Sequence, residues 1–326
     1  STGVRQAALS PDGSRVAVAA STPGTSGIFL VGRNGGPTVR LVSGGSSPVW
    51  MPNGKEIVFS AQGDLWLISV ESENLPADPT SGHPGLRQIT TGRQGGRAVR
   101  PSPDGKLLAF YSGRSGHQDI WLVPSDGSAD PTQLTRESMS LDDSRFAPAW
   151  SPDGRRIAYF SNKADYWEDD IWVVDVATGR AEQVSRGLMA SSSPVWSPDG
   201  TRIALLGTAK DEYWYEDLAY IYIIEPDAGA ESIVPMQVHA TDWLHNLGVF
   251  WSGSGSELFF PYLERARMEL WRVPADGGVA TRMTSMGGHF RSYHAAADGS
   301  GFVFLRSTPT RGTEVDYLEA SGGSVR

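Results

Sequence analysis

Ser151-Pro152-Asp153-Gly154 is the stretch that decides the fold, because the chain repeats it. The motif Ser-Pro-Asp-Gly occurs four times, and degenerate copies stand at three further places. Proline presets φ for the first turn position, aspartate bonds its own backbone, and glycine accepts a positive φ, so each copy predicts a tight turn. Successive closing glycines are 41 to 55 residues apart, which divides the chain into seven units. The copies lie at 10–13, 51–54, 102–105, 151–154, 197–200, 252–255 and 296–299.

Each unit has the same order of short apolar segments around its turn. A segment that often ends in tryptophan, such as Pro148-Ala149-Trp150, precedes the turn, and a second, such as Ile157–Ser161, follows it. A third segment, such as Ile171–Asp175, comes after a variable loop, and a fourth, such as Gln133-Leu134-Thr135, follows a glycine turn. Alternating apolar positions with β-branched and aromatic residues are typical of strands.

Seven such units predict an all-β fold, a seven-bladed β-propeller of four-stranded antiparallel blades that forms a single domain over residues 1–326. The tryptophans and aliphatic residues are expected to form the core between the blades. Each blade is expected to take its strands from its own unit, so that contacts between the first and seventh blades alone close the ring. The sequence stops at Arg326 inside the expected last strand, so we expect the chain to be the N-terminal part of a longer protein.

The composition argues against several kinds of partner and site. The net charge of -9, from 28 Lys and Arg against 37 Asp and Glu, disfavours nucleic acid. The absence of cysteine excludes disulfides and thiolate metal sites. No apolar run approaches the length of a membrane span, so no membrane partner is expected, and no cofactor is expected either. The N-terminus lacks a signal-peptide pattern, which favours a cytoplasmic location, or a periplasmic or secreted one if such a peptide was removed.

The fourth unit carries a resemblance to known propellers. Its turn is followed by Ile157-Ala158-Tyr159-Phe160 and then by Ile171-Trp172-Val173-Val174-Asp175. This pattern resembles the blades of TolB-like propellers and, equally, the propeller of the prolyl oligopeptidase family of serine peptidases, particularly its acylaminoacyl-peptidase-like branch. The resemblance covers nearly the whole chain. The likeness to the peptidases implies an α/β-hydrolase catalytic domain in the same parent chain and a peptide substrate.

No catalytic residue is predicted within this chain. Hydrolysis on an α/β-hydrolase domain needs a serine at a strand-to-helix elbow, commonly Gly-x-Ser-x-Gly. That pentapeptide does not occur, and Gly113-Arg114-Ser115-Gly116 is one residue short and follows a strand in a loop.

The loops between the second and third strands are expected to be long and varied at Gly113–Asp119, Asn162–Asp170, Thr208–Ala219 and Leu263–Glu269. Two of these loops combine aromatic rings with paired acids. DYWEDD, at 165–170, belongs to the fourth unit, and DEYWYED, at 211–217, to the fifth. Adjacent blades bring equivalent loops together, so the sequence predicts one contiguous surface beside the mouth of the central channel. The candidate residues for substrate binding or contact with a second domain are Asp165, Tyr166, Trp167, Glu168, Asp169, Asp211, Glu212, Tyr213, Trp214, Tyr215, Glu216 and Asp217.

The acids in these loops allow several roles. They could hold a peptide's terminal ammonium, flank a glycosidic bond, or bind a cation such as Ca²⁺. Exposed tyrosine and tryptophan are enriched at interfaces, so the rings could also pack on a neighbouring domain. In dipeptidyl peptidases of the same broad family, tyrosine followed by two glutamates binds the substrate amino terminus. Tyr215-Glu216-Asp217 is similar, with aspartate in place of the second glutamate.

Histidine offers a further alternative. His239, His245, His289 and His294 gather in the last units, and propeller lyases can bind a metal through several histidines. Their spacing matches no compact zinc signature, so no metal site is predicted. The preferred hypothesis is a non-catalytic propeller that gates a serine peptidase and helps bind short peptides. The alternatives are a stand-alone TolB-like protein-interaction scaffold and a propeller lyase or hydrolase acting on glycans.

Overall fold

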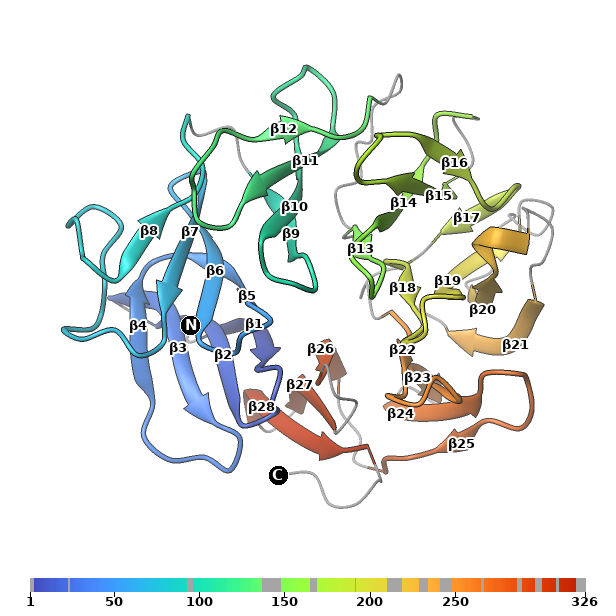
Figure 1. The fold of residues 1–326 in the computed structure, drawn as a ribbon. Helices are drawn as coiled ribbons and strands as arrows, with labels where there is room; N and C mark the ends of the chain where they lie inside the picture. The colour runs from blue at the N-terminus through green and yellow to red at the C-terminus, as the bar shows by residue number, and fades with distance from the viewer. Residues whose placement is uncertain are drawn as a thin grey trace.

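The computed structural model of the chain describes residues 3–22, 24–92, 96–136, 148–164, 169–190, 192–209, 219–228, 234–240, 248–264, 267–285, 289–296, 301–308 and 311–320. Seven antiparallel sheets follow one another around a ring in chain order (Figure 1). The prediction of a seven-bladed β-propeller is confirmed. In the described part of the chain, no helix is long and apolar enough to cross a membrane.

The first strand of each blade lies innermost and the last lies outermost (Figure 1). Blades one to three contain β1 Gly3–Leu9, β2 Arg15–Thr22, β3 Thr25–Gly32 and β4 Val39–Ser43; β5 Ser46–Trp50, β6 Glu56–Ala61, β7 Asp64–Ser69 and β8 Leu86–Gln88; β9 Arg97–Pro101, β10 Leu107–Ser112, β11 Asp119–Pro124 and β12 Thr132–Gln133. Blades four and five contain β13 Ala149–Trp150, β14 Arg156–Ser161, β15 Asp170–Asp175 and β16 Ala181–Gln183; β17 Leu188–Ala190, β18 Val195–Trp196, β19 Ile203–Ala209, β20 Ala219–Ile224 and β21 Val234–Ala240. Blades six and seven contain β22 Phe250–Trp251, β23 Glu257–Glu264, β24 Arg267–Pro274 and β25 Thr281–Arg282; β26 His289–Ala295, β27 Gly301–Thr308 and β28 Arg311–Glu319.

Two details differ from the expected blades. Blade five has a fifth strand, because β17 and β18 both pair with β19 and together make up its inner strand. The expected loop at 263–269 is wrong, because β23 and β24 stay paired out to Glu264 and Arg267. Long connections between the second and third strands therefore occur in blades three, four and five, at 113–118, 162–169 and 210–218. The expected last strand of blade seven lies outside the described residues.

Ring closure follows the expected arrangement in the described strands. β1 pairs with β2 inside blade one, and the three described strands of blade seven come from their own repeat. The two blades meet through a cluster of buried apolar side chains that includes Leu9, Val18 and Leu305. The Arg33 guanidinium also lies 4.9 Å from the centre of the Tyr317 ring. Side-chain packing therefore joins the ends of the ring, as we expected.

The hydrophobic core lies between the blades, which confirms the expected place of the tryptophans. Each of the six clusters of buried apolar side chains contains residues from neighbouring blades. One cluster, for example, joins Ile28 of blade one to Trp50 and Phe59 of blade two. Burying both faces of each sheet in this way explains why the second and third strands are almost continuously apolar.

The Ser-Pro-Asp-Gly turns are fixed by their own side chains. The Ser151 hydroxyl donates to Asp153 Oδ1 at 2.6 Å and accepts the Arg156 N–H at 2.9 Å, so it ties the two ends of the turn together. The turns of blades one, three and five repeat this geometry. In blade five, hydrogen bonds from Ser197 and Thr201 lower the pKa of Asp199 to about 2.

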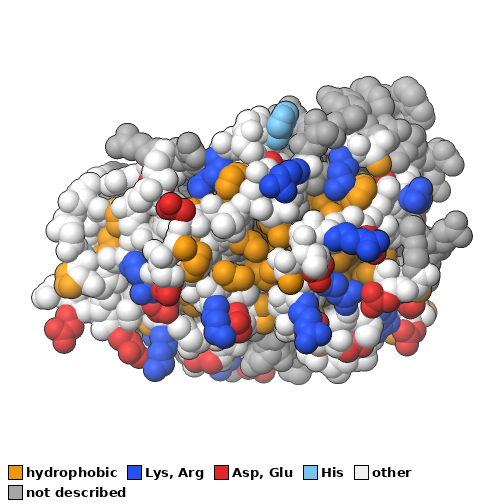
Figure 2. Space-filling view, turned by 45° about the horizontal axis from the view of Figure 1, so that its top comes forward, with side chains coloured by type: hydrophobic (Ala, Val, Ile, Leu, Met, Phe, Trp, Pro, Cys, Tyr) orange, Lys and Arg blue, Asp and Glu red, His pale blue; other side chains and the backbone are white. Residues whose placement is uncertain are grey.

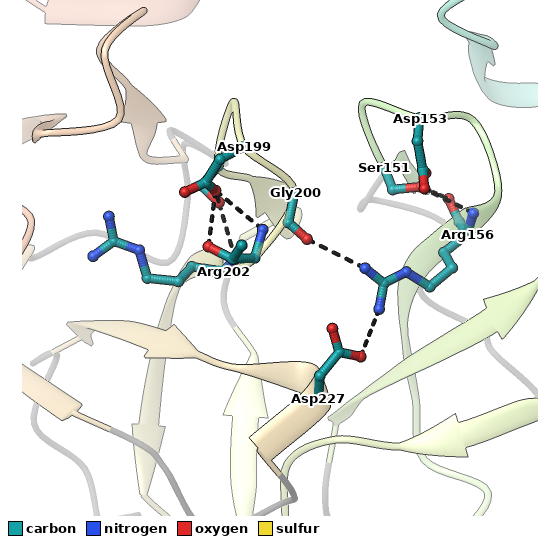
Figure 3. A network of polar contacts seen from close by, with 9 residues as sticks. Ser151, Asp153, Arg156, Asp199, Gly200, Arg202 and Asp227 are labelled. Atoms are coloured by element: carbon teal, nitrogen blue, oxygen red, sulfur yellow. Dashed lines mark hydrogen bonds and ion pairs between the residues drawn. The ribbon is translucent and has the colours of Figure 1, made fainter.

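A second recurring contact joins one blade to the next (Figure 3). The Trp196 indole N–H donates to the Ala149 carbonyl of the preceding blade at 3.0 Å. Arg156 of that preceding blade lies 4.7 Å from the centre of the Trp196 ring and donates to the Gly200 carbonyl at 3.2 Å and to Asp227 at 2.9 Å. The same combination links blade one to two and blade five to six, through Arg15 with Trp50 and Gly54, and through Arg202 with Trp251 and Gly255.

The inner strands of four adjacent blades are irregular. Their ladders skip residues, which marks a β-bulge in each strand, and Ser47 and Ala98 have φ values of 53° and 52°. Bulges redirect side chains out of the regular alternation of a strand. The four bulged strands are β1 at Val4–Gln6, β5 at 46–49, β9 at 97–100 and β26 at 290–292.

We predict that Arg156→Met lowers the free energy of unfolding by about 1–2 kcal/mol, because it removes a cation–π contact and a charged hydrogen bond between blades. The exposed Asp227 partner should add little to this loss. Urea denaturation followed by tryptophan fluorescence measures the change. The neighbouring Arg155→Met is the control, since Arg155 is exposed. Equal losses in the two variants would contradict a stabilising role for the inter-blade contact.

We also predict that Ala98→Gly stabilises the protein by about 0.5–1 kcal/mol. A left-handed conformation costs a non-glycine residue about 1–2 kcal/mol, and this exceeds the entropy lost by glycine. Ala109→Gly on the regular strand β10, directly opposite Arg100, should instead destabilise it by about 1 kcal/mol. Thermal and urea unfolding of the two variants test the difference, which a loss of stability in Ala98→Gly would refute.

Candidate functional site

The two aromatic and acidic loops lie largely outside the described residues. This holds for Asp165, Tyr166, Trp167 and Glu168 and for all of 211–217. The strands that flank them are described: β14 and β15 in blade four, and β19 and β20 in blade five. These blades are neighbours that share one apolar cluster. A joint surface formed by the two loops remains a prediction.

The structure describes the last two acids of the first motif, Asp169 and Asp170, and these differ in burial. Asp169 is partly buried, whereas Asp170 is fully buried at the start of β15. Asp170 accepts hydrogen bonds from Ser185 Oγ at 2.9 Å, Gln183 Nε2 at 2.9 Å and the Leu188 N–H at 3.2 Å. Its carboxylate therefore links the outer strand to the third strand by hydrogen bonds and has a structural role.

The same carboxylate recurs in other blades. Asp119 accepts from Thr135 and Gln133, Asp64 accepts from Thr90 and Gln88, and the buried Glu269 accepts from Thr284. In each case the hydroxyl also accepts the N–H of the residue after the acid. The sequence signal is an acid at or near the start of the third strand, matched by Thr or Ser two residues after the fourth strand ends.

Two cationic side chains pack on tryptophan rings at the beginning of the long loops in blades three and four. The Arg114 guanidinium lies 5.0 Å from the centre of the Trp121 ring, and Lys163 Nζ lies 3.7 Å from that of Trp172. Lys163 Nζ also donates to the Tyr159 hydroxyl at 3.1 Å. Both cations stand at equivalent positions, two residues after the second strand ends. These contacts fix where the two loops leave the sheets.

Ser115, in the incomplete nucleophile motif, has a structural partner. Its hydroxyl donates to Asp119 Oδ2 at 2.6 Å, in an exposed loop between two strands. A serine nucleophile needs a general base that can accept its proton and an oxyanion hole beside it. Asp119 instead belongs to the buried carboxylate contacts of the blade, so the loop gives no sign of a catalytic serine.

The inner strands of the blades have a distinct charge. The inner strands β1, β5, β9, β13, β17, β18, β22 and β26 contain no aspartate or glutamate, although the chain as a whole carries a net charge of -9. On the surface shown in Figure 2, basic and acidic side chains are interspersed. The basic residues and histidines on the inner strands are Arg5, Arg97, Arg100, His289, Arg291 and His294.

Arg100 and His294 are the two inner-strand groups whose pKa is strongly affected by their surroundings. Burial lowers the pKa of Arg100, and burial together with the charge of Arg100 lowers the pKa of His294 to about 4. Both side chains are partly exposed. Arg100 Nη1 donates to the Val99 carbonyl at 2.9 Å. With a pKa of about 4, His294 is neutral at neutral pH.

The histidines do not form a metal centre in the described part of the chain. No group of three or more His, Cys, Asp or Glu able to hold a metal ion occurs among those residues. His83 and His117 lie in loops, His245 is outside the described residues, and burial and Arg100 lower the pKa of His294. The sequence pattern raised His294 as a possible ligand, whereas Arg100 gave no signal because it is a single arginine within a strand.

Comparison with curated proteins gives two kinds of relative. A TolB homolog of Chlorobium luteolum is 27% identical over 180 residues, which cover 52% of this chain and 36% of that protein. Dipeptidyl-peptidase 5 of Porphyromonas gingivalis is 25% identical over 333 residues, which cover 86% of this chain and 48% of that protein. The chain therefore spans less than half the length of these relatives.

Solved structures show the same fold at low identity. A puromycin-hydrolyzing peptidase of Mycobacterium tuberculosis superposes with a TM-score of 0.72 and 16% identity, over 99% of this chain and 52% of that one. The β-propeller domain of the trilobed protease of Pyrococcus furiosus, which has an open velcro topology, gives a TM-score of 0.68 and 15% identity over 100% and 97% of the chains. The model of the PD40 family, the TolB beta propeller domain, matches residues 133–325. The match covers more than half of the chain, which therefore belongs to the PD40 family of TolB β-propellers.

Proposed function

We propose that this chain is the non-catalytic propeller domain of a prolyl-oligopeptidase-like serine peptidase, where it restricts access to the catalytic site and helps bind short peptides. One observation carries the proposal. The similarity to dipeptidyl-peptidase 5 extends over 86% of this chain but accounts for 48% of that protein. A parent of this kind would supply the missing catalytic machinery in an α/β-hydrolase domain.

The distribution of loops supports a one-sided binding surface. The second and third strands are joined by tight connections in blades one, two and six, where Thr22 pairs with Thr25, Ala61 with Asp64 and Glu264 with Arg267. The long connections of blades three to five leave the sheets on the same face, because they join equivalent strands. Loops of variable length on a rigid scaffold are the usual place for binding residues.

Within this surface we assign different roles to the rings and the acids of the fifth blade. Tyr213, Trp214 and Tyr215 would pack against the catalytic domain, as aromatic residues do at interfaces. Glu216 or Asp217 would face the cavity and accept hydrogen bonds from the ammonium of a peptide's N-terminus.

The second candidate function is a TolB-like scaffold that binds other proteins. The family match to residues 133–325 and the 27% identity to a TolB homolog favour it. In this case the aromatic residues would contact a protein partner, and the acids would show no preference for a free amino terminus.

We predict that short peptides with a free N-terminus bind the chain about 10- to 150-fold more tightly than their N-acetylated forms. A charged hydrogen bond is worth about 1.5–3 kcal/mol, and each 1.4 kcal/mol is tenfold in affinity. Isothermal titration calorimetry measures both peptides. Glu216→Gln with Asp217→Asn should abolish the difference, whereas Asp227→Asn, an exposed residue that contacts Arg156, should preserve it. Equal affinity of the two peptides for the unmodified chain would remove the substrate-binding role.

The purified chain by itself should not hydrolyse aminoacyl-nitroanilide or short peptide substrates. The described residues offer no nucleophile with a base and an oxyanion hole. A spectrophotometric assay on highly purified protein tests this, with Ser115→Ala as a comparison. Hydrolysis that persists through purification would contradict a non-catalytic role, and its loss in Ser115→Ala would identify the nucleophile.

A further inference from the structure

Asparagine followed by glycine is the dipeptide in which asparagine loses ammonia most readily, and it occurs twice in the chain. The asparagines are Asn34, Asn53, Asn74, Asn162 and Asn246, and only Asn34 and Asn53 precede a glycine. In this reaction the main-chain nitrogen of the following residue attacks the side-chain amide. Glycine favours the attack because it has no side chain to obstruct it. The contacts around each asparagine therefore decide which of the two can react in the folded chain.

The side chain of Asn53 is held by two hydrogen bonds. Asn53 Oδ1 accepts the Lys55 N–H at 2.9 Å, and Asn53 Nδ2 donates to Glu56 Oε2 at 2.9 Å. A β-carbon on Gly54 would also lie 3.9 Å from Pro11 in the preceding blade. Both the amide and the glycine that would attack it are therefore restrained by their neighbours.

Asn34 lies in the exposed turn between β3 and β4 and has no such restraint. Within the described part of the chain, its side chain makes no hydrogen bond. Gly35 and Gly36 follow with φ values of 83° and 108°, and a β-carbon on either would meet no atom within 4 Å. Glycine has the widest choice of backbone conformations. The Asn34 side chain is therefore free to approach the Gly35 nitrogen.

The main chain gives the two sites the same starting point. The Gly35 N–H donates to the Gly32 carbonyl at 2.9 Å, and the Gly54 N–H donates to the Met51 carbonyl at 2.9 Å. Each of these bonds must open before the nitrogen can attack. The two sites therefore differ in their side-chain contacts and surroundings, so Asn53 serves as an internal control for Asn34.

Asn34 also stands next to a contact that closes the ring. Arg33 Nη1 donates to the Tyr317 hydroxyl of blade seven at 3.4 Å, and the Arg33 guanidinium lies 4.9 Å from the centre of that ring. The Arg33 N–H donates to the Ser14 carbonyl at 2.9 Å, which fixes the point where Arg33 leaves the sheet. A change in the main chain at Asn34 therefore acts on the residue that reaches across to blade seven.

We propose that Asn34 is a site of spontaneous deamidation that weakens the contact between blades one and seven. The Gly35 nitrogen loses its proton and bonds to Asn34 Cγ, and the side-chain nitrogen leaves as ammonia, which gives a cyclic succinimide. Water then opens the ring at either carbonyl and leaves aspartate or isoaspartate. The reaction needs only water, so it is independent of the proposed peptidase parent.

Both products act on Arg33. The new carboxylate lies beside the arginine and competes with Tyr317 for its guanidinium, because a hydrogen bond to a charged acceptor is stronger than one to a hydroxyl. In isoaspartate the main chain also runs through the side-chain methylene group, which lengthens the turn. We therefore expect the modified chain to have a weaker ring closure.

The first test compares the two asparagines within one sample. The purified chain is kept in mildly alkaline buffer, and mass spectrometry follows the tryptic peptides 34–40 and 41–55. Asn34 should convert about 10-fold faster than Asn53 or more, because Asn53 must first lose its side-chain hydrogen bonds. A sample taken before incubation corrects for conversion during digestion. Absence of conversion at Asn34, or equal rates at the two sites, would overturn the proposal.

The unfolded chain provides the control for local sequence. In guanidinium chloride, where the hydrogen bonds of Asn53 are lost, the rates at Asn34 and Asn53 should approach each other. A difference that persists unchanged in the unfolded chain would refute the protective role of the contacts around Asn53.

The second test measures the effect on ring closure. After the same incubation, the unmodified chain should unfold at a lower temperature than before. Asn34→Gln should keep its unfolding temperature, because the longer side chain forms the cyclic intermediate much more slowly. Asn53→Gln is the matched control and should lose stability as the unmodified chain does. An equal loss in Asn34→Gln would contradict the assignment to this residue.

Arg33→Met then tests the route by which the modification acts. This variant has already lost the contact with Tyr317, so conversion at Asn34 should lower its unfolding temperature less than it lowers that of the unmodified chain. Mass spectrometry on the same samples confirms that the extent of conversion is equal. An equal loss of stability in Arg33→Met would overturn the link to the contact between blades one and seven.

Discussion

The tryptophan at the end of an inner strand holds this ring together, because its indole N–H reaches the main chain of the preceding blade. No cysteine is present, and no sheet in the described residues contains strands from two repeats. Blade order therefore depends on side chains that cross between sheets: the buried apolar layers, the indole hydrogen bonds and the arginines stacked on the rings. The indole donors and their acceptors are Trp50 and Ala8, Trp150 and Arg100, Trp196 and Ala149, and Trp251 and Val195.

The features that the sequence could predict are those decided by neighbouring residues. Ser151, Asp153 and Arg156 complete their turn within six positions, so the repeated motif is enough to locate seven blades. The arginine–tryptophan contact also has a signal in the sequence, which can be recognised once the structure is known. Arginine stands two residues after the turn glycine in blades one, four and five, and in each case the next blade supplies a tryptophan. Blade four supplies Trp150, but blade three has Leu107 at the position of the arginine. This junction therefore has the indole hydrogen bond without an arginine from that position on the ring.

The features that the sequence could not predict depend on register and on distant partners. Asp169 and Asp170 look alike in the sequence, yet only Asp170 meets Ser185 and Gln183, because the start of β15 determines which acid faces the outer strand. The polar residues at 263–269 suggested a loop, but cross-strand pairing continues through them in blade six.

The unequal connections between the second and third strands show how one ring can carry different loops. Blades one, two and six join these strands by tight turns, whereas the connections of blades three, four and five extend over 113–118, 162–169 and 210–218. In blades three and four, Asp119 and Asp170 begin the third strand directly after the long connection and accept hydrogen bonds from the residues beside the fourth strand. The same contact is made by Asp64 after the tight turn of blade two. Because this carboxylate holds the third strand in place whatever the length of the connection before it, the loop can change while the blade keeps its shape, which is the condition for placing variable binding residues on a rigid scaffold.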